Sequence, residues 1–323
     1  MNVFKKIDLF IALLIGMILL AWLVPGLGVT EKWYSLDSLS SIGISFIFFF
    51  YGLKLSPSQV MQGLNNYRLH FIVQFSTFVL FPIIVILFYP LVKTESGHLL
   101  WLAVFFLAAL PSTVSSSVVM VSMAKGNVPG SIFNASISGL IGIIATPLWM
   151  GLFMEGGSNG FNFLDSLLSL STKILLPVIL GMLLHRYFGK IAIKNSKALA
   201  WFDKSVILVI VYKSFSSSFT SGLFDSIGLI DLGILFIAII VLFLLVFQVI
   251  NIVSKQMNFN REDRITALFN GSKKSLVHGT VFSKVLFSGM ATQGIFIIPI
   301  MIYHALQLIV ISFIAQRMSK EID

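Results

Sequence analysis

The sequence contains no cysteine and very little charge. With no cysteine among 323 residues, disulfides, iron–sulfur clusters and cysteine-ligated zinc sites are excluded. Only 11% of the residues are Asp, Glu, Lys or Arg, whereas soluble domains carry roughly 25%. So little charge cannot cover the surface of a water-soluble protein of this length.

Several functional signatures are also missing. No G-x-x-x-x-G-K-[ST] loop is present, which excludes an ATP-driven pump within this chain. The five histidines show no metal-ligand spacing, and the apolar segments hold no carboxylate pair or positioned nucleophile. We therefore expect neither an enzyme nor a bound cofactor.

What the chain has in excess is apolar residues, 57% of the total, including 31 phenylalanines. The apolar runs are continuous and do not alternate with period two, which argues against a membrane β-barrel. The fold class predicted is all-α, a polytopic membrane protein embedded in the lipid bilayer. The net charge of +9 lies in short loops between apolar runs, so we expect no nucleic-acid partner.

Ten apolar segments are long enough to cross a hydrocarbon core that needs roughly 20 helical residues. The N-terminal run lacks a cleavage site and is taken as the first span, not a signal peptide. The expected spans are 7–24, 39–55, 69–91, 98–124, 130–153, 167–188, 203–220, 229–254, 265–288 and 293–316.

Charge alternates between successive loops. The even-numbered loops are basic, with Lys54, Arg68, Lys125, Arg186, Lys190, Lys194, Lys197, Lys255, Arg261 and Arg264. The odd-numbered loops carry most of the acids, including Glu31, Asp37, Glu95, Glu155, Asp165, Asp225 and Asp231. The positive-inside rule then places both termini in the cytoplasm and the protein in the plasma or cytoplasmic membrane.

The loop after the fifth span lies near the middle of the chain. It divides the protein into residues 1–154 and 155–323, with five expected spans in each part. An odd number of spans per part gives the two parts opposite orientations, as in transporters built from inverted repeats. We therefore expect two inverted five-helix repeats.

The fourth span of each part is interrupted by polar residues. In the first, Pro111 must break or kink the helix, and hydroxyl residues follow it. In the second, Asn270 and Gly271 interrupt the apolar run. Paired interruptions at corresponding positions are the best sequence indicator of a transporter's binding site at the membrane midplane. The interruptions could also be ordinary kinks, which membrane helices tolerate.

Lys273 and Lys274 follow the second interruption, where a charge is costly unless it faces a cavity or a partner. Successive helical residues point about 100° apart, so the two lysines cannot both face one site in a regular helix. Either the backbone is unwound, or each lysine has a different partner. We expect at least one of them to line a substrate cavity. Lys284 is closer to a span end and is expected to extend to the membrane interface.

These considerations define the candidate residues for binding substrate or ions. They are Ser112, Thr113, Ser115, Ser116, Ser117, Ser131, Asn134, Asn270, Ser272, Lys273, Lys274, Ser275 and His278, with Gln74 weaker. Other polar residues within the spans are expected to form helix–helix hydrogen bonds instead, namely Ser136, Gln248, Asn251, His304 and Gln307, and the same role competes with binding at Gln74 and Asn134. Lys213 lies nearer a span end, where extension to the interface competes with such a bond.

Four stretches carry a resemblance to a known family. They are "FFYGLKLSP" (49–57), "ALPSTVSSSVVMVSMAKGNVPGSIFNASISGLIGIIATPLW" (109–149), "LFNGSKKSLVHGT" (268–280) and "IPIMIYHALQLIVISFIAQR" (298–317). The chain resembles the bile acid:sodium symporter family, in its branch similar to sodium/bile acid cotransporter 7. This resemblance implies a panel of helices 1, 2, 6 and 7 and a core of the others, with broken helices 4 and 9 crossing at its centre. It also implies alternating-access transport of an organic anion, usually with two sodium ions.

The sodium sites of the family match this sequence only in part. By resemblance, Ser116, Ser117 and Ser131 correspond to ligands of the first site, whereas Ala135 replaces a hydroxyl residue. In the second site Phe269 replaces a glutamate, and Lys273 and Lys274 replace a polar pair. A family glutamine corresponds loosely to Gln74. At about 4 Å, an ammonium would repel sodium by roughly 4 kcal/mol at an effective dielectric near 20.

The sequence therefore favours a secondary transporter of a small organic anion, in which a fixed lysine charge replaces one or both sodium ions. Such a lysine could also couple transport to protons. The alternative is a regulatory or scaffold membrane protein with a vestigial transport site, which would tolerate substitution of both lysines. A membrane-embedded enzyme ranks third. The substrate, the direction of transport and the oligomeric state are left open by the sequence.

Overall fold

The computed structural model describes residues 9–29, 36–55, 66–113, 115–154, 163–222, 228–288 and 290–320. Every element in these ranges is helical, and they contain no strand. Six of the described helical segments are long and apolar enough to cross a membrane. The predicted class, an all-α polytopic membrane protein, is confirmed.

In the first half, the helices follow the expected spans closely. They are α1 (Leu9–Leu23), α2 (Gly26–Val29), α3 (Leu36–Lys54), α5 (Tyr67–Phe75), the π-helical turn η2 (Ser76–Leu80), α6 (Phe81–Leu87), the 3-10 turn η3 (Tyr89–Leu91), α7 (Glu95–Ala109), α8 (Ser115–Met123) and α9 (Val128–Met154).

The second half has the same character. Its helices are α10 (Phe163–Leu170), the π-helical turn η4 (Ser171–Leu175), α11 (Leu176–Lys194), α12 (Ser196–Thr220), α13 (Leu229–Gln256), α14 (Arg261–Gly271), α15 (Leu276–Leu286) and α16 (Gln293–Lys320).

Both fourth spans are split, as the sequence indicated. The first becomes α7 and α8, of 15 and 9 residues, and the second becomes α14 and α15, of 11 residues each. No piece of this length spans a hydrocarbon core alone, which takes roughly 20 residues. The ten-span count and the inverted repeat therefore remain predictions, although the interruptions on which they depend are present.

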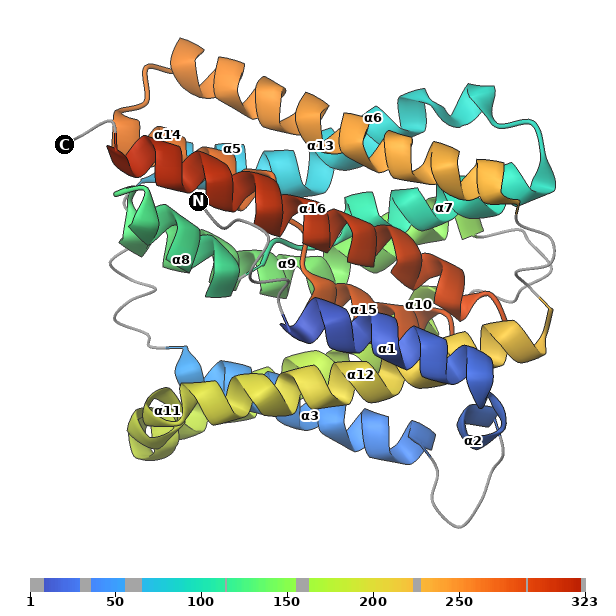
Figure 1. Ribbon diagram of the computed structural model, residues 1–323. Helices are drawn as coiled ribbons and strands as arrows, with labels where there is room; N and C mark the ends of the chain where they lie inside the picture. Colours follow the sequence, from blue (N-terminus) through green and yellow to red (C-terminus); the bar gives the residue numbers. More distant parts are fainter. Residues whose placement is uncertain are drawn as a thin grey trace.

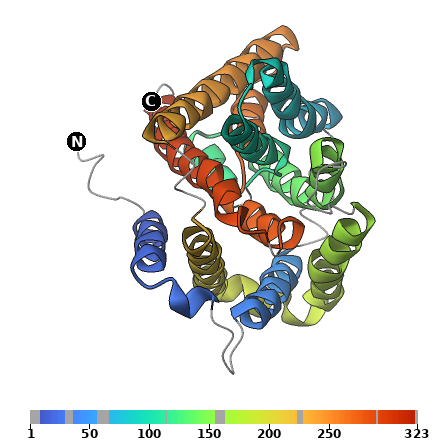
Figure 2. The same ribbon diagram turned by 90° about the vertical axis from the view of Figure 1, so that its right-hand side faces the viewer.

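The helices form two packed groups (Figures 1 and 2). The small group consists of α1, α2, α3, α11 and α12, and the large group of α5 to α9 and α13 to α16, whereas α10 packs against α9 and α15 and leads through η4 into the small group. Within the small group, α3 and α11 cross so closely that a Cβ on Gly52 would collide with the carbonyl oxygen of Val178. Small residues at such crossings let helix backbones approach in a membrane.

Basic loop ends gather at one end of the molecule. The ends of α3, α8, α11, α13 and α16 lie at the left in Figure 1. There Asp263 accepts hydrogen bonds from the side chains of Asn66 and Asn127, both at 2.7 Å. We call this the basic end, after Lys54, Arg68, Lys125, Lys194 and Arg261. The C-terminal ends of α1, α9 and α12 and the start of α7 lie at the other end, here called the opposite end.

Candidate functional site

The two interruptions lie against each other in the large group. The backbone N–H of Ser275 donates to the carbonyl oxygen of Pro111 at 2.9 Å. The Ser112 hydroxyl donates to the carbonyl oxygen of Asn270 at 2.6 Å. Each break thus satisfies polar backbone groups of the other. A helix end buried without such partners would be strongly destabilising.

Lys274 occupies the centre of this arrangement. Its ammonium donates to the carbonyl oxygens of Thr77 (2.7 Å), Ala108 (2.7 Å) and Leu110 (2.8 Å). It also lies 4.1 Å from the centroid of the Phe81 ring, a cation–π contact. A lysine has three N–H donors, so every donor is used. The side chain is fully buried and is enclosed by oxygen atoms and an aromatic face.

Each of these carbonyls lacks a helical partner for a definable reason. Ala108 and Leu110 lie at the C-terminal end of α7, where the last carbonyls have no N–H ahead of them. Thr77 lies in the π-helical turn, where the N–H of Phe81 bonds to Ser76 instead. The next residue, Pro82, has no N–H. Lys274 therefore supplies the donors that both backbone irregularities lack.

The backbone of Lys274 is held as firmly as its side chain. Its N–H donates to Gln307 Oε1, and Gln307 Nε2 donates to its carbonyl oxygen, both at 2.9 Å. The Tyr303 hydroxyl donates to the carbonyl oxygen of Ser272 at 2.6 Å. Tyr303 and Gln307, both on α16, thus supply hydrogen bonds that a continuous helix would make within itself. They stabilise the unwound segment.

Lys273 points to the other side of the crossing. Its ammonium donates to the carbonyl oxygen of Ser116 at 2.9 Å. Beside it, the Thr113 hydroxyl lies 2.8 Å from the hydroxyls of Ser116 and Ser117. Both sequence alternatives for the lysines are therefore found together. The backbone is not helical at Lys273 and Lys274, and the two ammonium groups have different partners.

Asn270 links the second interruption to α9 through two hydrogen bonds. The Ser131 hydroxyl donates to Asn270 Oδ1, and Asn270 Nδ2 donates to the Ser131 carbonyl oxygen, each at 2.9 Å. Further along α9, Gln74 Nε2 donates to the carbonyl oxygen of Asn134 at 3.0 Å. Asn134 also contacts His70 Nδ1 at 2.9 Å. These polar side chains bind one another and link α5, α9 and α14.

His278 lies where α15 meets the small group. Its Nδ1 is 2.9 Å from the Ser275 hydroxyl, and its ring packs edge-on against Phe48 and Tyr51 of α3. Within the described part of the chain, its buried Nε2 has no hydrogen-bond partner. A Cβ added to Gly139 would lie 3.0 Å from that atom, so a side chain there would press on the imidazole.

The structure thus brings most of the expected residues to one crossing, from α8, α9, α14, α15 and the segments between them. Ser272 belongs to this set, and its hydroxyl donates to Leu268 at 2.6 Å. Ser115 begins α8, but its side chain lies outside what the structure describes. The expected extension of Lys284 to the membrane interface stays a prediction. Its ammonium lies 2.8 Å from Asp37, a 56% exposed carboxylate in the first turn of α3.

Sequence reasoning missed Thr77 and Phe81 as partners of a lysine and placed Gln307 only among packing residues. Backbone carbonyls carry no signal of their own in a sequence. A usable signal did exist for the π-helical turns, because "STFVLFP" (76–82) and "STKILLP" (171–177) share one pattern and each contains such a turn.

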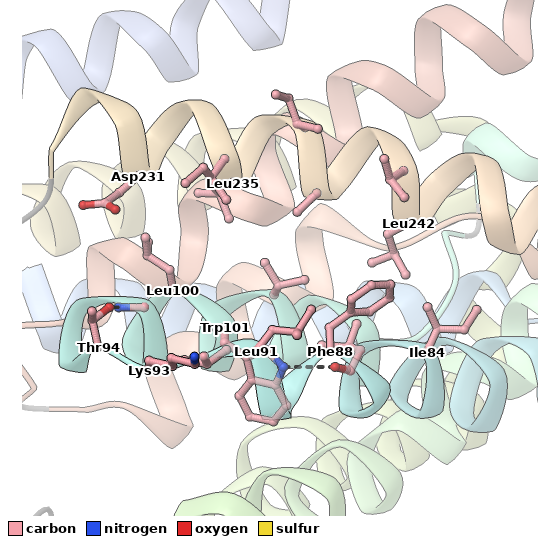
Figure 3. Close-up of a pocket in the computed structure, with 18 of the residues that line it drawn as sticks. Ile84, Phe88, Leu91, Lys93, Thr94, Leu100, Trp101, Asp231, Leu235 and Leu242 are labelled. Carbon is pink, nitrogen blue, oxygen red and sulfur yellow. Dashed lines mark hydrogen bonds between the residues drawn. The ribbon is translucent and has the colours of Figure 1, made fainter.

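A separate groove of about 590 Å³ lies between α6, α7 and α13. Its lining is mainly apolar, with Lys93, Thr94 and Asp231 at one end (Figure 3). None of the expected site residues lines it.

Interrupted apolar helices that meet around buried polar residues are features of membrane transport proteins. The model of the SBF-like CPA transporter family matches residues 8–320, so the chain belongs to that family. The resemblance to bile acid:sodium symporters is thereby confirmed.

Curated relatives agree with this assignment. An uncharacterized protein of Pseudomonas aeruginosa is 35% identical over 316 residues, covering 98% of this chain and 94% of the relative. The Escherichia coli K12 protein named "Putative symporter YfeH" is 34% identical over 323 residues, covering 100% and 96%. Sodium/bile acid cotransporter 7-B of Xenopus laevis is 28% identical over 308 residues, covering 93% and 88%.

Several oxygen atoms at the crossing are already occupied by donors of the chain itself. Sodium is bound by oxygen atoms, usually with a negative charge nearby, and Phe269 stands where the resemblance implies a glutamate. The oxygen atoms of Ser131 and Asn270 are bonded to each other's groups. The carbonyls of Thr77, Ala108 and Leu110 already bind an ammonium. No group of three or more His, Asp or Glu side chains suited to a metal occurs in the residues described.

Proposed function

We propose that this membrane transport protein is a secondary transporter of a small organic anion and that a fixed lysine charge replaces bound sodium. The observation that carries the proposal is the Lys274 ammonium, enclosed by three carbonyl oxygens at 2.7–2.8 Å. Oxygen atoms in such an arrangement would suit a monovalent cation, and here the cation is covalently part of the chain. It cannot leave and cannot couple transport to a sodium gradient.

Lys273 is the proposed contact for the anion. Its ammonium has one hydrogen-bond acceptor in the described part of the chain, the Ser116 carbonyl oxygen, so two of its three N–H donors remain for a substrate. The hydroxyls of Thr113, Ser116 and Ser117 lie beside it and could bind further anion oxygens. Buried anions are bound by such charge-assisted hydrogen bonds.

Two packed groups supply the elements for alternating access. We propose that the small group is the panel, the large group is the core, and residues 1–154 and 155–323 are inverted repeats. In support, α7–α8 runs toward the basic end and α14–α15 runs away from it (Figure 1). Under this proposal the basic end and both termini are cytoplasmic, because basic loops are retained on that side.

The substrate is proposed only as a class. Relatives carry the name sodium/bile acid cotransporter 7, which points to amphipathic organic anions as the first compounds to test. The lysines and hydroxyls at the crossing select for negative charge and not for a steroid skeleton.

The test is uptake of labelled organic anions into proteoliposomes, with Lys273→Met and the exposed Lys190→Met as a matched pair. We expect uptake above that of empty vesicles in wild type and Lys190→Met, and its loss in Lys273→Met. Uptake that survives in Lys273→Met would contradict the assigned role. Absence of transport by wild type, with both lysines dispensable for a cellular phenotype, would favour the scaffold alternative.

A further inference from the structure

An ion pair joins the two helix groups at the opposite end of the molecule. Asp37, in the first turn of α3, lies 2.8 Å from the ammonium of Lys284 on α15. Asp37 belongs to the small group and Lys284 to the large group. The same carboxylate contacts Lys213 of α12 through its other oxygen. One aspartate thus holds two lysines, one from each group.

Other polar contacts close the space between the groups at this end. The Ser218 hydroxyl, near the end of α12, donates to the carbonyl oxygen of Ala291 at 2.7 Å. It also accepts from the N–H of Gly294, the second residue of α16, at 3.2 Å. Together with the ion pair, these contacts attach α3 and α12 to α15 and α16. These contacts hold the two groups together at the opposite end.

A contact that an anion from solution is to replace must be exposed to solvent, and this ion pair is partly exposed. The side chain of Asp37 is 56% exposed, whereas those of Lys213 and Lys284 are 26% and 10% exposed. Lys173 on η4 lies near enough to Lys284 to repel it electrostatically. Two ammonium groups therefore share one partly exposed carboxylate, with a third cation close by. Such a cluster attracts anions from solution.

We propose that Lys284 and Lys213 form an entry site for a carboxylate substrate and that Asp37 is the latch that keeps this entrance closed. A substrate carboxylate takes the place of the Asp37 side chain on Lys284. Because the Asp37–Lys284 pair bridges the two groups, its replacement frees α3 from α15. The substrate's part in this proposal rests on the proposed transport function, whereas the latch itself does not.

Thiol labelling tests the latch directly, because the natural chain has no cysteine to remove. Ser214, next to Lys213 on α12, is buried, and its carbonyl oxygen faces Gly294 of the large group. Ser214→Cys would be labelled with a membrane-impermeant maleimide applied at the opposite end. We expect Asp37→Asn to increase the labelling rate about fivefold, the change that roughly 1 kcal/mol produces. Asp231→Asn, an acid at the same end on α13, should leave it unchanged.

A second cysteine position controls for an effect of Asp37→Asn that is confined to the surroundings of residue 214. Ile210→Cys lies one helical turn further from the opposite end on the same face and is also buried. Equal labelling of wild type and Asp37→Asn at both positions would overturn the latch.

The substrate's part is tested with acetate, succinate and cholate against potassium chloride at equal ionic strength. Any of the three that competes with Asp37 should accelerate labelling in the wild-type background and have no effect in Asp37→Asn. Failure of all three would overturn the entry site and leave the latch standing. Labelling needs no transport, so a failure of the proposed function in uptake experiments would be seen separately.

Discussion

The Lys274 ammonium lies 2.8 Å from the carbonyl oxygen of Leu110, the residue that caps the C-terminal end of α7. A helix C-terminus carries a partial negative charge, so a cation there is stabilising by up to about 2 kcal/mol in a partly buried geometry. The carbonyl of Ala109, between the two that Lys274 binds, accepts instead from the Thr146 hydroxyl at 2.8 Å. The three carbonyls from Ala108 to Leu110 are therefore all paired in the middle of the protein.

Removing the Lys274 charge should destabilise the fold. In Lys274→Met, the carbonyls of Thr77, Ala108 and Leu110 lose their shared donor in a buried site. We expect a loss of about 1–3 kcal/mol in the free energy of unfolding for each carbonyl left unsatisfied, the usual cost of a buried acceptor without a donor. The measurement is the thermal midpoint in detergent by size-exclusion chromatography. Lys190→Met, on the exposed face of α11, should stay within about 0.5 kcal/mol of wild type.

The two adjacent lysines should differ in what they affect. Lys273 makes one hydrogen bond, to Ser116, so Lys273→Met should retain a thermal midpoint much closer to wild type than Lys274→Met does. It should nevertheless abolish anion uptake, because the proposed substrate contact is lost. Equal thermal destabilisation by the two substitutions would argue against this division of roles.

Gly142 on α9 should not tolerate a side chain. A Cβ at this position would lie 2.9–3.0 Å from three atoms of the Pro111 ring, so Gly142→Ala must push the first interruption away. Overpacking of this kind costs about 1–3 kcal/mol. Gly16 on α1 has nothing within 4 Å of such a Cβ, and Gly16→Ala should stabilise its helix by about 0.5–1 kcal/mol. Thermal midpoints that move in the same direction for both variants would contradict the packing described.

The crossing of α3 and α11 is equally restrictive. A Cβ on Gly181 would meet the carbonyl oxygen of Phe49, which is backbone and cannot move aside independently. We expect Gly181→Ala to lower the yield of folded protein, whereas Gly233→Ala, with open space around it, should express as wild type does. Monodispersity after extraction into detergent is the readout.

Local chemistry explains how much of this site could be predicted. Pro111 cannot donate a backbone hydrogen bond, and Asn270–Gly271 weakens a helix, so both interruptions could be located from the sequence alone. The sequence left two alternatives for Lys273 and Lys274, and one of them was an unwound backbone. Such features depend only on residues that are neighbours in the sequence.

The rest depends on contacts between residues far apart in the chain. Lys274 and Thr77 are 197 positions apart, and Lys284 and Asp37 are 247 apart. Which carbonyl or carboxylate a lysine reaches is decided by how the helices pack. Sequence patterns therefore located the lysines but gave neither the π-helical turn as an acceptor nor Asp37 as the partner of Lys284.

The most direct test of the central claim is the sodium dependence of anion uptake into proteoliposomes. Uptake would be measured with sodium outside and with choline in its place, at equal ionic strength and with no proton gradient. If Lys274 stands in for a bound cation, the initial rates should be the same in both solutions. A saturable increase with sodium, accompanied by charge movement, would contradict the account and require a sodium site elsewhere in the chain.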